Sequence, residues 1–256
     1  MQSLIEFIGQ NQVILFLLLF TRLSGLFAFF PFFSHMKIPM SIKAAMVFFM
    51  TTFLFPLATL PDIEFNLTNI ALALVSEIMF GFIAGLFLII VFAMLEMAGM
   101  SISFVMGFTM ASVMDPQTGT SSPVISTVFT LLALVVLLAF NGHHLMILFI
   151  ADSLNILPLG GFYPAYNIWN YLLSAVTSMF IFGFVLSFPI VGLSLLADIV
   201  FGMLMKTMPS FNLLVVGFPI KIMVGFVVLL TVLSSIMLIF KREIFEAINK
   251  LGILFV

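Results

Sequence analysis

Long apolar runs, separated by short breaks rich in proline, glycine and charged residues, are the dominant pattern along this chain. A helix that crosses a lipid bilayer needs about 20 apolar residues at a rise of about 1.5 Å each. The strict alternation typical of membrane β-strands is missing, so the runs predict an all-α integral membrane protein built of helical hairpins. The candidate spans are residues 13–33, 42–60, 70–95, 97–113, 124–150, 171–197 and 213–240.

Composition supports this prediction and excludes several other classes of protein. Hydrophobic residues make up 64% of the 256 positions and charged residues only 7%, whereas roughly a quarter of a soluble domain is charged. The net charge of −2 argues against nucleic-acid binding, which needs clustered Lys and Arg. The chain has no cysteine, which excludes thiolate metal sites and cysteine nucleophiles.

The basic residues in the breaks do not collect on one side of the membrane, as the positive-inside tendency would place them. If residues 97–113 fold back as a re-entrant element, six spans remain, and the breaks at 37–43 and 206–221 lie opposite the basic C-terminal segment. If they cross as a seventh span, residues 37–43 join the C-terminal side and residues 206–221 do not. Either the tendency is only a bias in this chain, or some helices are sheltered by partner subunits instead of lipid.

Four charged residues, Arg22, Glu77, Glu96 and Asp198, lie in or at the ends of the apolar runs. An unpaired charge at the bilayer centre costs about 2.5–3.5 kcal/mol on insertion scales, so these side chains should face protein or water. Buried structural pairing is the favoured interpretation. A proton or ion path is the alternative, although the sequence shows no repeated acidic pattern and no inverted pair of broken helices.

Two adjacent histidines, His143 and His144, follow Asn141 and Gly142. Neighbouring helical positions point in different directions, so this pair lacks the i, i+4 spacing of a helical metal site. We expect both histidines to be buried polar residues at a helix kink or interface, with no bound metal. No Ser-His-Asp order, phosphate-binding loop or paired-carboxylate motif is present, so neither an enzyme nor a cofactor is expected.

Small residues recur every four positions at Gly99, Ser103, Gly107 and Ala111, and this spacing places them on one helix face that another backbone can approach closely. Gly81 and Gly85 form a similar pair. Methionine, a soft side chain that fills irregular gaps, recurs beside the small row and leads into the polar segment 115–123. A hydrophobic rim beside a polar segment is typical of a closable opening. The methionines of this second row are Met106, Met110 and Met114.

Short motifs occur in order along essentially the whole chain, and together they resemble the flagellar export-gate protein family FliR and its counterparts in virulence-associated type III secretion. The most distinctive is the Gly-Phe-Pro-Ile-Lys run that opens the last apolar segment. The motifs are Arg22-Leu23-Ser24-Gly25 followed by Pro31; Ile38-Pro39 with Lys43; Glu77, Gly81, Phe82 and Gly85; Met106-Gly107-Phe108 leading to Asp115-Pro116; Asn141-Gly142-His143-His144; Asp198 with Gly202; Pro209-Ser210-Phe211-Asn212; and Val216-Gly217-Phe218-Pro219-Ile220-Lys221.

This resemblance implies a channel subunit in the bacterial inner (cytoplasmic) membrane, at the flagellar basal body. Its implied partners are two small gate subunits of the FliP and FliQ types, a further component of the FlhB type, and the unfolded flagellar proteins that are exported. It also implies a division into an N-terminal helical part, residues 1–170, and a C-terminal helical hairpin, residues 171–256. The segment from Met106 to Ser122 would lie in the channel and help to plug it.

By the same resemblance, Phe108, Met110 and Met114 would be gating side chains next to Gly107, with Asp115 and Pro116 shaping the turn. Gly217, Pro219 and Lys221, from the distinctive last motif, are expected to serve assembly, as are the small residues named above. An ion- or proton-coupled transporter, with Glu77, Glu96 and Asp198 as carriers, and a scaffold without a conduction role are the alternatives.

Overall fold

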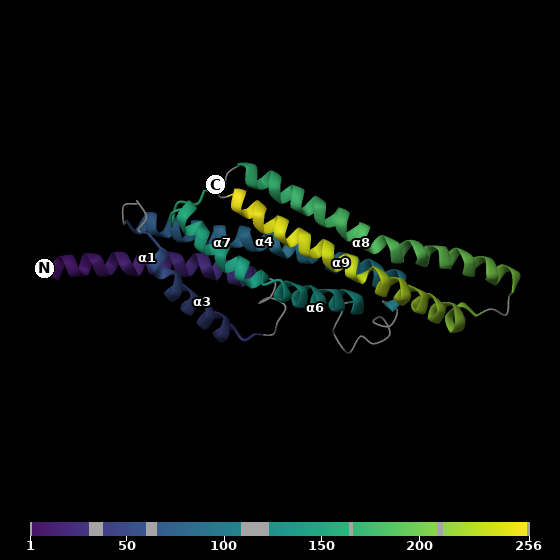
Figure 1. Cartoon of the computed structure of the whole chain (residues 1–256). Coiled ribbons are helices and arrows are strands. Elements are labelled where there is room, and N and C mark those ends of the chain that lie inside the picture. The colour runs from purple at the N-terminus through teal and green to yellow at the C-terminus, as the bar shows by residue number, and fades with distance from the viewer. Residues whose placement is uncertain are drawn as a thin grey trace. The chain divides into compact units, whose positions relative to one another are not determined.

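The computed structural model describes residues 2–30, 38–59, 66–108, 123–163, 166–208 and 212–254, and all regular structure in these ranges is helical (Figure 1). The all-α prediction is therefore confirmed. The elements are α1 (Gln2–Phe29), α3 (Met40–Leu54), the 3₁₀ turn η1 (Phe55–Leu57), α4 (Leu67–Val105), α6 (Val124–Ala139), α7 (Gly142–Ile156), α8 (Tyr166–Thr207), the π-helical turn η3 (Leu213–Gly217) and α9 (Phe218–Leu254).

Five of these helices are long and apolar enough to cross a membrane, which confirms the prediction of a helical membrane protein. A sixth candidate span is the bent pair α6 and α7. The candidate spans found in the described residues are Asn11–Phe29, Met40–Leu57, Leu67–Val105, Ile168–Thr207 and Val215–Gly252.

The break expected between residues 95 and 97 is wrong, because α4 continues without interruption from Leu67 to Val105. Glutamate is a good helix former, and no proline or turn sequence accompanies Glu96, so its charge does not end the helix. Residues 97–105 are therefore neither a re-entrant element nor a separate span.

The apolar run at residues 124–150 divides in two where Asn141 adopts a left-handed backbone conformation with φ of +57°. The axes of α6 and α7 differ by 65° across this break. Asparagine is one of the few residues that tolerate this conformation, so the Asn-Gly sequence is the local cause of the bend.

Two compact units make up the chain. The first contains residues 1–90, 140–175 and 244–256, and the second contains residues 91–139 and 176–243. The first has α1, α3 and α7 as whole helices, with α3 packed on α1, and the second has α6. Because α4, α8 and α9 contribute residues to both units, each unit draws on both sides of position 170. The division into an N-terminal part and a C-terminal hairpin stays a prediction.

Many large apolar side chains remain on the surface of the chain. Phe53 is 75% exposed, Phe104 72% and Leu238 67%. Exposed apolar area on this scale is typical of surfaces that contact lipid or other polypeptides, so the chain is suited to an apolar environment along most of its helices.

Candidate functional site: two ion pairs and the end of helix α4

A fully buried ion pair joins α1 to α4 in the first unit. Arg22 and Glu77 are both 0% exposed, and the guanidinium binds the carboxylate through two bonds. Nε donates to one carboxylate oxygen, and Nη2 donates to the other over 3.0 Å. This two-point geometry is the strong form of an Arg–carboxylate pair.

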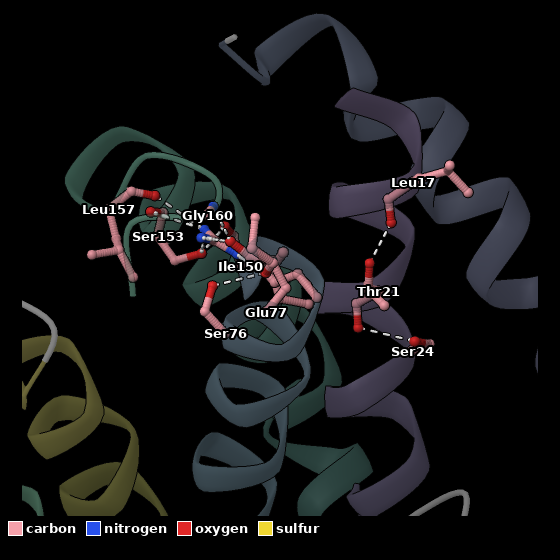
Figure 2. Close-up of polar contacts among 11 residues, drawn as sticks. Leu17, Thr21, Ser24, Ser76, Glu77, Ile150, Ser153, Leu157 and Gly160 are labelled. Carbon is pink, nitrogen blue, oxygen red and sulfur yellow. Dashed lines mark hydrogen bonds and ion pairs between the residues drawn. The ribbon is translucent and has the colours of Figure 1, made fainter. Parts of the chain in front are cut away.

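Helix α7 and the turn that follows it supply the remaining hydrogen-bond partners of this pair (Figure 2). The Nη1 group of Arg22 donates to the backbone oxygen of Leu157 over 3.2 Å and to the hydroxyl of Ser153 over 3.3 Å. The backbone N–H of Gly160 donates to Glu77 over 2.6 Å. The guanidinium also lies 4.6 Å from the ring centre of Phe80, within range of a cation–π interaction.

The pair therefore fixes three segments of the first unit relative to one another: α1, α4 and the end of α7. Removing two charges from water is costly, and a buried pair is stable only when its remaining hydrogen-bonding groups are also satisfied. Ser153 and the Gly160 turn supply these additional partners, and no sequence pattern predicts either of them. Neither shows a recognisable spacing relative to Arg22, although the Pro158–Gly161 segment has turn chemistry.

Glycine allows α1 and α4 to approach closely beside this pair. A Cβ atom added to Gly81 would lie 2.6 Å from the backbone nitrogen of Leu26 and 2.8 Å from the carbonyl oxygen of Arg22, and one added to Gly85 would collide with Phe29. Gly81 and Gly85 thus lie at a helix–helix contact within the first unit, as the small-xxx-small pattern predicts.

The small-residue row of α4 has a different set of neighbours in the second unit. Gly99 lies against the backbone of Ser126 on α6, and a Cβ atom there would come within 2.7 Å of the Ser126 nitrogen. Ser103 is fully buried. Gly107, the last member of the row among the described residues, follows the end of α4 and has a φ of +85°, which is strained for any residue with a side chain.

The end of α4 is held against α9. The fully buried Met106 fills the space above Gly225, where an added Cβ would meet its Cε at 2.7 Å. A Cβ on Gly107 would meet the ring of Phe218 at 3.0 Å, and the rings of Phe108 and Phe226 pack edge to face with centres 5.9 Å apart. Met106, Gly107 and Phe108 therefore anchor the start of the segment that leads to residue 122.

A second ion pair links α8 and α9 in the second unit. The Lys221 ammonium lies 2.7 Å from each carboxylate oxygen of Asp198. The lysine is 7% exposed, but the aspartate is 50% exposed. Asp198 is thus paired but not buried within this chain, contrary to expectation, because no described helix covers this side of α8.

The two histidines lie at the bend between α6 and α7. Their ring centres are 4.3 Å apart; His143 is partly buried and His144 is exposed. The expectation that both are buried is therefore wrong for His144, which lies on the open face of α7. No group of three or more potential metal ligands occurs among the described residues.

Three further candidates lie near the start of α9 or in the C-terminal part of α4. Gly217 is the last residue of η3 and is buried. Pro219 is the second residue of α9, where its missing N–H leaves no helical bond unmade. Glu96 is half-buried. The candidates Met110, Ala111, Met114, Asp115 and Pro116 lie outside the described residues.

This geometry defines a class of protein: an all-α integral membrane protein whose apolar helices are joined by ion pairs, Arg22 with Glu77 in the first unit and Lys221 with Asp198 in the second. The particular family follows from comparison with known sequences. Residues 13–247 match the family described as "Bacterial export proteins, family 1", and the chain belongs to this family.

Named relatives agree over most of the chain. It is 32% identical over 231 residues to the flagellar biosynthetic protein FliR of Bacillus subtilis (strain 168), covering 89% of each chain. It is 29% identical to the protein of the same name from Escherichia coli (strain K12), covering 90% of this chain and 88% of the relative. For the one from Pectobacterium carotovorum subsp. carotovorum, the identity is 32% over 86% of this chain and 84% of the relative. The resemblance inferred from the motifs is confirmed.

Proposed function

We propose that this chain is a channel subunit of the flagellar protein-export apparatus in the bacterial cytoplasmic membrane. It would help to form and seal the pore through which unfolded flagellar proteins pass. Membership of a bacterial export family and the flagellar names of the relatives support the export role. The proposed neighbours are gate subunits of the FliP and FliQ types and a component of the FlhB type.

The observation that carries the pore assignment is the anchored end of α4. Met106 and Phe108 pack on Gly225 and Phe226 of α9, so the segment after residue 108 starts from a fixed point. The sequence of that segment combines methionines with a polar, proline-containing stretch. Soft apolar side chains can exclude water from a narrow opening and then part for a passing chain.

In this proposal the seal is passive. The chain carries no ATP-binding motif, so energy for export has to come from other proteins. Two of the three carboxylates considered as carriers are committed to structural pairs: Glu77 accepts hydrogen bonds from Arg22 and Gly160, and Asp198 accepts from Lys221. These contacts support a structural role for both residues over a proton-carrying one.

Deletion of residues 110–119 tests the proposal, because it removes most of the segment while keeping the anchor at Met106–Phe108. We expect the complex to assemble and to leak small ions, measured as conductance after reconstitution in planar bilayers. Gly192→Ala is the matched control, since nothing lies within 4 Å of an added Cβ at Gly192. An assembled deletion complex with unchanged conductance would contradict a sealing role.

Glu77→Gln separates the proposal from the transporter alternative. The pore account predicts that any loss of export follows a loss of folded, assembled protein. Loss of proton coupling by the purified protein alone, with assembly intact, would favour the transporter.

A further inference from the structure

Helix α7 presents an exposed stripe in the first unit. His144, Leu148, Asp152 and Ile156 recur at four-residue spacing and are all exposed, with Leu148 57% and Ile156 45% exposed. Residues four apart lie above one another on a helix, so the four side chains form one ridge that alternates between polar and apolar groups.

A cleft of about 310 Å³ lies along this ridge, between α7 and the end of α9. Its walls are mainly aliphatic and aromatic, and its polar groups include the Asp152 carboxyl and the Asn249 amide. The lining residues that matter here are Leu145, Leu148, Asp152, Ile156, Ile248 and Asn249.

Asp152 differs from the two paired carboxylates described above. Glu77 binds Arg22 and Asp198 binds Lys221, but no hydrogen bond or ion pair joins Asp152 to another residue in the part of the chain that the structure describes. Helices α6 and α7 together are long and apolar enough to form one bent membrane span, and an unpaired carboxylate is costly at the bilayer centre. Asp152 is therefore an exposed carboxylate that is available to a cation from outside the chain.

We propose that the α7 ridge and its cleft dock an apolar helix of another membrane polypeptide, which places one Lys or Arg opposite Asp152. This inference rests on the proposed function only in requiring that the chain works within an assembly. An apolar helix covers the cleft, and its basic side chain neutralises the carboxylate. Arg or Lys pairs strongly with a carboxylate when water is excluded.

The ridge itself favours a helix over a lipid as the occupant. His144 and Asp152 are eight residues apart, which corresponds to about 12 Å along the axis. One headgroup cannot satisfy polar groups at that separation, whereas a packed helix presents side chains along its whole length. The apolar ridge residues Leu148 and Ile156 then pack in the grooves of the docked helix.

Site-specific photo-crosslinking in the native membrane tests the inference on the full chain. A photoreactive amino acid replaces Leu148, and the same replacement at Leu131, which is 58% exposed on α6, is the control. We expect a polypeptide adduct at Leu148 whose crosslinked peptide is apolar and carries Lys or Arg within one helical turn, and no adduct with that peptide at Leu131. A phospholipid adduct only, an adduct with a second copy of this chain, or no adduct would overturn the proposal.

Charge reversal then tests the role of Asp152. Asp152→Lys should lower the adduct yield about tenfold, Asp152→Glu should retain it, and changing the identified basic residue to Glu should restore it in the Asp152→Lys background. An unchanged yield for Asp152→Lys, or no restoration, would contradict the pairing. If deletion of residues 110–119 makes the complex leak ions but Leu148 crosslinks only to lipid, this inference alone is overturned. If Leu148 crosslinks to the expected helix but the deletion causes no ion leak, only the pore assignment is overturned.

Discussion

Removal of the Glu77 carboxylate tests the energetics of the buried ion pair directly. In Glu77→Ala, the Arg22 guanidinium loses both of its bonds to the carboxylate, and the Gly160 N–H loses its acceptor. Arg22 is 0% exposed, so water does not replace these partners. The variant retains a buried charge with no counter-charge.

The expected loss in the free energy of unfolding is about 3–5 kcal/mol, the range measured when one partner of a buried ion pair is removed. The double variant Arg22→Met with Glu77→Leu removes both charges and should recover part of that loss. Recovery should be incomplete, because Leu157 and Gly160 then lack partners for their backbone groups, at about 1–3 kcal/mol for each unsatisfied group.

The assay is equilibrium unfolding of the purified chain in mixed micelles, followed by far-ultraviolet circular dichroism. The control is Lys250→Ala, which breaks the pair with Glu246 on α9 at 2.9 Å. The two side chains of this pair are 44% and 42% exposed, so Lys250→Ala should lower the free energy of unfolding by less than about 1 kcal/mol. If Glu77→Ala destabilised the chain no more than this control, the buried pair would not hold the first unit together.

Three further predictions follow from contacts within each unit. Gly81→Leu should lower the free energy of unfolding by several kcal/mol, because the leucine side chain would collide with the backbone of α1. The control Gly202→Leu, with nothing within 4 Å of an added Cβ, should unfold like the unaltered protein, and equal losses of unfolding free energy in the two variants would refute the close approach of α1 and α4. Gly107→Leu should lower recovery of the complex in a pull-down, because the residue has a φ of +85° and faces Phe218; normal recovery would rule this out. In thermal unfolding, Asp198→Asn should destabilise the chain more than Lys221→Met, because it leaves the 7% exposed lysine charge unpaired, whereas the reverse change leaves the 50% exposed aspartate in contact with its surroundings. The reverse order of melting temperatures would show that the burial of the lysine does not determine the cost of breaking this pair.

The helical class and the close contacts of α4 followed from the sequence because they depend on local composition and spacing. Apolar length predicts a membrane helix, and Gly81 and Gly85 mark a face where a neighbouring backbone can approach. The bend at Asn141 also has a local cause, in the Asn-Gly sequence. These features need no knowledge of which helices are neighbours.

The partners of the charged residues could not be predicted in the same way. Arg22 and Glu77 are 55 residues apart and Asp198 and Lys221 are 23 apart, so only tertiary packing brings them together. The continuity of α4 through Glu96 was also missed, because a charge in an apolar run looks like a boundary although it does not end a helix. The unexpected exposure of Asp198 depends on which helices cover α8, and no local pattern encodes that.

The central claim is that this chain is one subunit of a membrane complex, with its exposed apolar helices covered by other polypeptides as well as by lipid. The most direct test is the mass of the particle that copurifies with the full chain after gentle extraction, measured by native mass spectrometry. The account predicts a defined particle several times heavier than the 28.4 kDa chain, containing other membrane polypeptides. A stable monomer, fully inserted in vesicles and carrying only lipid, would contradict it.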